Sequence, residues 1–192
     1  MAMNPFVFGR GLRSAGDPYM LVIGMTGVRM GDRFAQIGCA DGGRLAAIAG
    51  KVGLSGSASA IVPDESSASR ARKGAAQAGV LVDVGIAPPT KLPMDDGALD
   101  VVVVDETGGL IGKLSEPDRA AAVREIARVL RPGGRVVFVS AAPRSGLSSL
   151  LSRASSAPPF AAGPPLAAGG FKSVRTLAER EGLVFVEGVK PR

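Results

Sequence analysis

The sequence predicts one α/β domain, built on a mostly parallel, doubly wound sheet with helices on both faces and an antiparallel end. Between residues 31 and 139, short apolar runs alternate with segments of helical periodicity. The clearest apolar run, 99–104, ends in four consecutive valines, which is typical of a strand buried on both faces of a parallel sheet. Strands and helices that alternate at these intervals indicate βαβ units with right-handed crossovers.

The first half of this region contains three predicted strands, 33–37, 57–62 and 80–84, and two predicted helices, 44–49 and 64–78. Glycines at 50–53 end the first helix. Pro63 ends the second strand, because proline has no backbone N–H for the ladder. Asp64, Ser66 and Ser67 are each suited to cap the second helix, and Gly79 to end it.

The second half contains a helix that opens at Ser115 and runs to Leu130, and a loop at Arg131–Gly134 that ends it. A strand follows at 135–139, and a closing β-hairpin is predicted at 171–177 and 183–189. Three acids are expected to shape the turn before the valine strand: Asp95, Asp96 and Asp100. Three arginines are expected on a solvated helix face: Arg124, Arg128 and Arg131.

Two segments differ from this pattern. Residues 141–170 are dominated by Ala, Pro, Ser and Gly, with a single helical candidate at 148–153, and are predicted to form a surface loop or lid. Residues 1–30 are predicted to form an N-terminal helical cap over the α/β domain at 31–192. Both segments are suited to exclude water and select a ligand.

Composition excludes several classes of function. The chain has no histidine and one cysteine, Cys39, so Ser-His-Asp hydrolysis, His-based metal sites and internal disulfides are excluded, and no metal is expected. The net charge is +6, but the arginines are dispersed and aromatic residues make up only 4%, so a nucleic-acid partner is not favoured. Without a signal peptide or a membrane span, the expected location is the cytoplasm.

Three blocks then carry a resemblance: Gly31–Cys39 (GDRFAQIGC), Leu92–Val103 (LPMDDGALDVVV) and Arg124–Arg135 (REIARVLRPGGR). Their order and content resemble the class I S-adenosylmethionine-dependent methyltransferases, of the methyltransferase type 11 group. The resemblance covers residues 31–139. It implies a seven-stranded Rossmann-like sheet closed by the terminal hairpin, S-adenosylmethionine as cofactor, and methyl transfer to a small-molecule acceptor.

The resemblance also implies where the cofactor binds. A glycine-rich loop after the first strand, with Gly38, Cys39, Ala40 and Gly42, corresponds to the family's cofactor loop. Ile86 and Ala87 correspond to an adenine-facing wall after the third strand. Asp64 is equally suited to hold the ribose and to cap a helix. Cys39 is also expected to be a small packing residue.

Asp105 and Glu106 follow the valine strand, where the family approaches the substrate and the transferring methyl group. The resemblance implies that these carboxylates contact the cofactor, through Asp105, and orient or deprotonate the acceptor. The alternative is a solvated pair at the end of a strand.

The chain departs from the family pattern at four positions. Gln36 replaces an acid before the loop, Ala40 replaces its middle glycine, and Val62 and Ile86 stand where the family places acids. These departures leave a second function open, in which the domain has lost turnover and acts as a binding or assembly partner. An RNA-associated methyltransferase, suggested by the charge alone, is a third.

Overall fold

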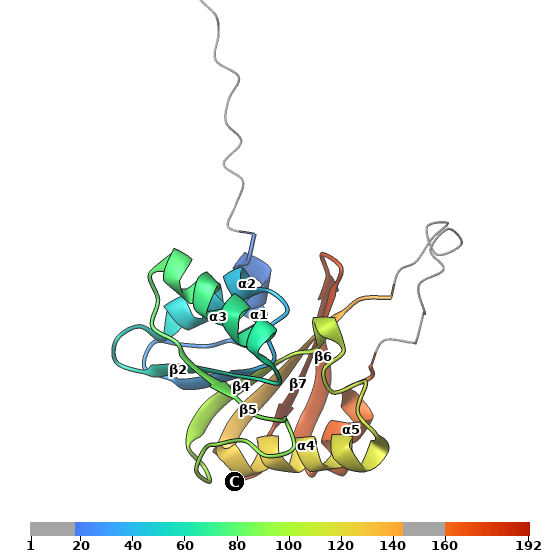
Figure 1. Cartoon of the computed structure of the whole chain (residues 1–192). Helices are drawn as coiled ribbons and strands as arrows, with labels where there is room; N and C mark the ends of the chain where they lie inside the picture. Colours follow the sequence, from blue (N-terminus) through green and yellow to red (C-terminus); the bar gives the residue numbers. More distant parts are fainter. Residues whose placement is uncertain (1–17, 144–159) are drawn as a thin grey trace, which may run out of the picture.

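The computed structural model describes residues 18–143 and 160–192, and places seven strands in one sheet (Figure 1). The strand order is β3-β2-β1-β4-β5-β7-β6. Strands β1 to β5 pair in parallel, and β7 runs antiparallel to both of its neighbours. The strands are β1 Arg33–Ile37, β2 Ser57–Val62, β3 Asp83–Ile86, β4 Leu99–Asp105, β5 Leu130–Ala141, β6 Lys172–Arg180 and β7 Leu183–Val189. The predicted α/β fold with an antiparallel end is confirmed.

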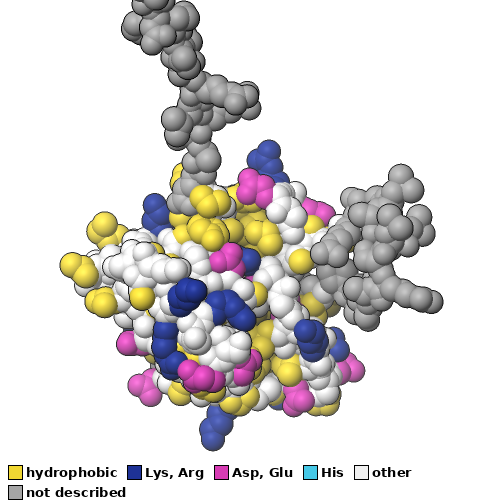
Figure 2. Space-filling model, turned by 45° about the horizontal axis from the view of Figure 1, so that its top comes forward, with side chains coloured by type: hydrophobic (Ala, Val, Ile, Leu, Met, Phe, Trp, Pro, Cys, Tyr) yellow, Lys and Arg dark blue, Asp and Glu magenta, His cyan; other side chains and the backbone are white. Residues whose placement is uncertain are grey.

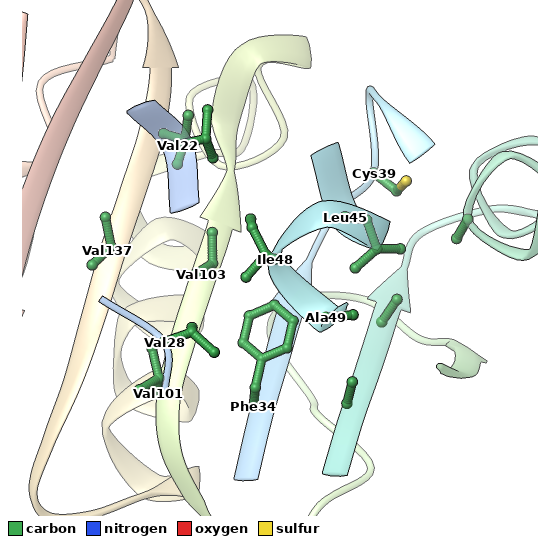
Figure 3. Packing of buried hydrophobic residues seen from close by; sticks show 14 of the residues in the cluster. Val22, Val28, Phe34, Cys39, Leu45, Ile48, Ala49, Val101, Val103 and Val137 are labelled. Carbon is green, nitrogen blue, oxygen red and sulfur yellow. The ribbon is translucent and has the colours of Figure 1, made fainter. Parts of the chain in front are cut away.

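Helices cover both faces of this sheet. The helices are α1 Met20–Thr26, α2 Gly42–Val52, α3 Glu65–Ala78, α4 Glu116–Val129 and α5 Gly163–Ala168, with a 3₁₀ turn η1 at Glu106–Gly108. Helices α1, α2 and α3 pack on one face, and α4 and α5 pack on the other. In the first layer, Phe34 and Val103 of the sheet meet Ile48 of α2 (Figure 3). The valines of β4 alternate between the two layers, which explains why all four are apolar.

Three helices begin with the side-chain caps that their sequences favour. Asp41 accepts hydrogen bonds from the N–H groups of residues 43 and 44, Asp64 from that of Ser67, and Ser115 from that of Asp118. Helix α3 ends at Gly79, which has a φ of 66°, as predicted. Helix α2 is longer than predicted at both ends. Capped by Asp41, it begins at Gly42, two residues before Arg44, and no glycine stops it before Gly53.

Two predicted boundaries are wrong. The third strand was expected at 80–84, but β3 begins at Asp83, which pairs with Ser59 of β2. Val80 and Val82 are apolar because they pack against the first core layer from outside the sheet, and Leu81 between them is 83% exposed. At Arg131–Gly134, a loop was expected. The chain instead enters β5 at Leu130, and residues 131–134 form a bulge between the pairs Leu99–Leu130 and Val101–Arg135.

Arg128, expected on a solvated helix face, is partly buried, with 31% of its side chain exposed. Its guanidinium donates to the carbonyls of Leu92 and Met94 and to the carboxylates of Asp96 and Glu125. The Glu125 carboxylate in turn accepts the Leu92 N–H at 2.8 Å. Hydrogen bonds thus join two of the three blocks that carry the family resemblance. They hold the loop before β4 against α4.

The described part of the two predicted covers is short. Helix α1 lies within the predicted N-terminal cap, and α5 lies within the predicted lid. The remainder of each prediction, including the helical candidate at 148–153, falls on residues 1–17 and 144–159, outside the described residues. Among the helices in the described ranges, none has both the length and the apolar character to cross a bilayer.

Candidate functional site at the sheet switch point

The sheet changes its winding direction between β1 and β4, where crossovers lead to opposite sides, and ligands of open α/β sheets bind outside the strand ends at such a point. A groove with a volume of about 340 Å³ opens there. It lies between the loop after β1, the start of α3 and the segment after β4. We call it the switch-point groove. It is lined by Gly38, Cys39, Ala40, Pro63, Asp64, Ser67, Arg70, Asp105, Gly108, Gly109, Leu110 and Lys113.

The loop after β1 presents bare backbone to the groove. Gly38 has a φ of 81°, in the left-handed region, and a Cβ built there would lie 2.9 Å from Leu110 Cδ2 and 3.1 Å from the Asp105 carbonyl oxygen. Gln36 is fully buried, and its Nε2 donates to the Gly38 carbonyl at 2.9 Å. The buried Gln36 amide thus fixes the orientation of the Gly38 carbonyl.

The Asp105 carboxylate fixes the same loop from the other side. One oxygen accepts the Ala40 N–H at 2.9 Å. The other accepts from Arg44 at 3.2 Å and from the Thr107 N–H and hydroxyl at 3.2 and 2.6 Å. Only 1% of the Asp105 side chain is exposed. The carboxylate therefore ties the loop after β1, helix α2 and η1 together at the floor of the groove.

Glu106 points away from the groove, into the segment that follows η1. Its two oxygens accept the N–H groups of Ile111 and Gly112 at 2.7 and 2.8 Å. Burial raises the pKa of Glu106, and the two backbone N–H groups partly oppose that rise. Glu106 does not line the groove, and its carboxylate holds the loop from which Leu110 and Lys113 reach the groove.

Asp64 takes the capping role, one of the two that the sequence left open for its position. Its Oδ1 accepts the Ser67 N–H at 2.8 Å and so caps α3, and the residue also lines the groove. The backbone hydrogen bond from Ser67 lowers the pKa of Asp64. A carboxylate is thus present at the rim, two residues beyond the position where the family places its acid.

Two basic residues of the groove were not predicted. Arg70, one helical turn beyond Ser67 on α3, donates to the Cys39 carbonyl, and Lys113 donates to the Gly108 carbonyl at 2.8 Å. Neither stands in a motif. The only available signal was the helical spacing that places residues 67 and 70 on the same face of α3 as the cap.

Several predicted cofactor residues lie elsewhere. Gly42 is not among the lining residues. A Cβ on Gly42 would overlap the Arg70 carbonyl oxygen and a Cβ on Gly74 would overlap the Gly42 backbone, so these glycines permit the close contact of α2 with α3. Ile86 and Ala87 also fall outside the lining. Ile86 is 49% exposed at the end of the edge strand β3.

The substitutions noted in the sequence do not fill the groove. Ala40 is exposed, and Val62 is buried in the core between β2 and the helices. Burial, and secondarily the charge of Asp105, raise the pKa of Cys39 to about 11, so its thiol stays protonated near neutral pH and is a poor nucleophile.

Charges on the face that Figure 2 shows are mixed. Figure 2 shows Lys and Arg side chains next to Asp and Glu side chains rather than in one continuous patch of a single sign. Within the described residues, no three His, Cys, Asp or Glu side chains are grouped so as to hold a metal ion.

Comparisons with known proteins agree with the fold. A family model described as a methyltransferase domain matches residues 35–138, more than half of the chain. A demethylmenaquinone methyltransferase of Mycolicibacterium gilvum is 43% identical over 61 residues, 31% of this chain and 25% of that protein. An uncharacterized protein of Mycobacterium tuberculosis is 30% identical over 120 residues, 62% of this chain and 41% of that protein. The matches thus span less than half of these curated relatives.

Solved structures share the fold at low identity. A SAM-dependent methyltransferase from Aquifex aeolicus is similar with a TM-score of 0.70 and 20% identity, over 90% of this chain and 89% of that chain. The cyclase SpnF is similar with a TM-score of 0.63 and 19% identity, over 89% and 78%. Because one of these is a cyclase, the fold alone does not define the reaction. With the family match over residues 35–138, however, the chain belongs to the methyltransferase domain family, whose cofactor is S-adenosylmethionine.

Proposed function

We propose that this chain binds S-adenosylmethionine in the switch-point groove and transfers its methyl group to a small-molecule acceptor. The observation that carries the proposal is the loop after β1 at the floor of an open groove, where Gln36 holds the Gly38 carbonyl and Asp105 holds the Ala40 N–H. A loop that is held on both sides loses little conformational freedom when a ligand binds against it.

The groove residues suit the chemical groups of the cofactor. Arg70 and Lys113 supply positive charge for a carboxylate, and Asp64 supplies an acceptor for hydroxyl groups. Gly38 and Ala40 allow a ligand to approach the backbone closely. When bound, S-adenosylmethionine supplies a methyl group that its sulfonium already activates.

The chain's own residues then contribute position more than proton transfer. All four hydrogen bonds to the Asp105 carboxylate, and both to Glu106, come from the chain itself. These contacts favour a positioning role for both acids over the acid–base role that the sequence suggested. Holding the reactants in line is a large part of the rate in such a displacement, and it requires no histidine.

The first test is a calorimetric titration with S-adenosylmethionine on the full chain and on two cap variants. Asp64→Ala and Ser115→Ala each remove one helix cap, but only Asp64 lines the groove. We expect Asp64→Ala to weaken binding about tenfold, and Ser115→Ala to leave it unchanged. An equal loss of affinity in the two variants would show that Asp64 only caps α3 and does not contact the cofactor.

Turnover is tested by release of S-adenosylhomocysteine in the presence of a panel of small oxygen, nitrogen and carbon nucleophiles. Acceptor-dependent release supports the proposal. A chain that gives neither heat nor a thermal shift at millimolar cofactor would contradict it.

The second candidate, a domain that binds a partner without turnover, is favoured by one observation. Gln36 uses its amide to hold the Gly38 carbonyl, so the position that carries an acid in the family is committed to the loop. Cofactor binding without methyl transfer to any acceptor in the panel would support this candidate.

A further inference from the structure

A second groove, also of about 340 Å³, lies at the opposite edge of the sheet. It is formed where β4 and β5 begin and where the antiparallel β7 ends. Its charged lining residues are Arg29, Arg131, Arg135, Arg175, Asp32, Asp100 and Glu187. We call it the opposite-edge groove. Nothing in the proposed methyl transfer uses it.

Two carboxylates of this groove, the buried Glu187 and the partly buried Asp100, are each shared between two arginines. Glu187, whose side chain is only 6% exposed, accepts from Arg175 at 2.8 Å and from Arg135 at 3.5 Å. Asp100, 16% exposed, accepts from Arg33 at 3.1 Å and from Arg131. One negative charge thus fixes two positive ones, and positive charge remains in excess at each pair.

The arginines keep donors for a further anion. A guanidinium carries five N–H donors, and a carboxylate engages only some of them. Arg131 and Arg175 are 48% and 69% exposed, so their remaining donors are accessible. Gly27 lets the Arg135 guanidinium lie directly against the backbone, because a Cβ on Gly27 would overlap that guanidinium. Arg135 donates to the Gly27 carbonyl at 2.9 Å.

From these contacts we propose that the opposite-edge groove binds a small polyphosphate anion, as free polyphosphate or as the phosphate chain of a nucleotide. Paired guanidinium groups held at fixed positions match the several oxygens of a phosphate chain. The groove's volume admits a compact ligand. The mixed signs of its walls favour a ligand of a few phosphates over a long polymer, which would need a continuous basic track.

The ligand of this groove is distinct from the methyl acceptor. Asp100 and Asp105 stand at the two ends of β4, five residues apart, and a strand rises about 3.3 Å per residue, so the two grooves are separated by roughly 17 Å. A molecule bound among the arginines does not reach the switch-point groove. The proposal therefore stands whether or not the chain binds S-adenosylmethionine.

The test is calorimetry with inorganic tripolyphosphate and with uridine triphosphate at physiological salt, without S-adenosylmethionine. Uridine triphosphate lacks adenine and so avoids a base that suits the other groove. We expect both to bind, and Arg131→Gln and Arg175→Gln each to weaken them about tenfold. Equal affinities for the two ligands assign recognition to the phosphates alone, and tighter binding of the nucleotide assigns the nucleotide as the source.

The matched control is Arg72→Gln. Arg72 lies on α3, is 52% exposed and pairs with one carboxylate, Glu65, so this change removes the same charge from a surface outside both grooves. It is expected to alter affinity less than twofold. Absence of binding to the wild-type chain, or an equal loss in Arg72→Gln, overturns the proposal. An RNA oligonucleotide that binds more than tenfold tighter than tripolyphosphate also overturns it, in favour of a nucleic-acid surface.

Discussion

The two ends of strand β4 carry carboxylates in contrasting surroundings. At its carboxyl end, Asp105 accepts mainly from backbone N–H and hydroxyl groups and from one buried arginine. At its start, Asp100 accepts from the backbone N–H of Arg33 and from the guanidinium groups of two half-exposed arginines. The first environment shapes the backbone, and the second arranges charge.

This difference suggests why one edge of the sheet suits a shaped organic ligand and the other an anion. Backbone donors aligned by a buried carboxylate fix a loop in one conformation, as the methionine and nucleoside parts of a cofactor require. Arginines that share a carboxylate keep long side chains and spare donors at the surface, which suits a ligand recognised by charge. Three changes test how sharply the two edges differ.

The largest effect is expected for Asp105→Asn. The introduced amide nitrogen faces either the Ala40 N–H or the donors of Arg44 and Thr107, so at least one donor loses its acceptor. Arg44 also loses the nearer of its two counter-charges and keeps only Asp41, at 3.9 Å. We expect a loss of about 3 kcal/mol in the free energy of unfolding at neutral pH, measured by urea denaturation. Asp100→Asn, the same change at the other end of β4, is the control. Equal losses would remove the distinction between the two edges.

A smaller effect, with a distinctive pH dependence, is expected at residue 36. Gln36→Glu and Gln36→Met both remove the donor to the Gly38 carbonyl, at about 2 kcal/mol near neutral pH. A protonated carboxylic acid restores that donor, and burial beside a carbonyl raises the pKa of the introduced acid. Stability is therefore present at low pH and lost as the pH rises through the raised folded-state pKa.

The readout is the difference in urea midpoint between each variant and the wild type across that pH range. The difference should close at low pH for Gln36→Glu and stay constant for Gln36→Met. Parallel profiles for the two variants would show that volume, not the donor, is what residue 36 contributes.

The smallest effect concerns Asp100. Burial alone raises its pKa, but the hydrogen bonds from Arg33 and Arg131 outweigh burial and bring the pKa to about 2, from an ordinary value of 3.8. A lowered carboxyl pKa adds stability above the ordinary value, and that stability is lost as the pH falls from about 4 towards 2. Because both arginines are half exposed, we expect about 1 kcal/mol after screening.

Thermal unfolding of the wild type and Asp100→Asn across this pH range measures the contribution. The variant should start less stable and converge on the wild type at the acid end. A constant difference in stability between the two proteins would show that the Asp100 ion pairs do not stabilise the fold.

The sequence predicted the parts of the fold that depend on local pattern. The predictions for the valines of β4, the Asp64 and Ser115 caps and the helix end at Gly79 are confirmed. Burial on both faces, N-capping and a left-handed φ each favour particular residue types, so each can be recognised from the sequence. The third strand was misplaced, because Val80 and Val82 are apolar through packing outside the sheet. An apolar run records burial, and only the pairing with Ser59 shows where the strand begins.

The site was predictable to a lesser degree. The resemblance identified the loop around Gly38, but the contact of Asp105 with the Ala40 N–H joins residues 65 positions apart and leaves no local signal. The same is true of Arg70, which reaches the Cys39 carbonyl from a different helix. Gly42 was attributed to the cofactor because its spacing matched the family, while in the structure its missing side chain makes room for Gly74.

That contact between the two glycines has a consequence for engineering ligand range. A methyl group added at Gly74 would displace α3 as a whole, because it would strike the main chain of α2 rather than a side chain able to turn aside. Residues 64, 67 and 70 would shift with the helix. A search for variants with altered preference should therefore include this remote position, where one carbon atom can reshape a wall that it never touches.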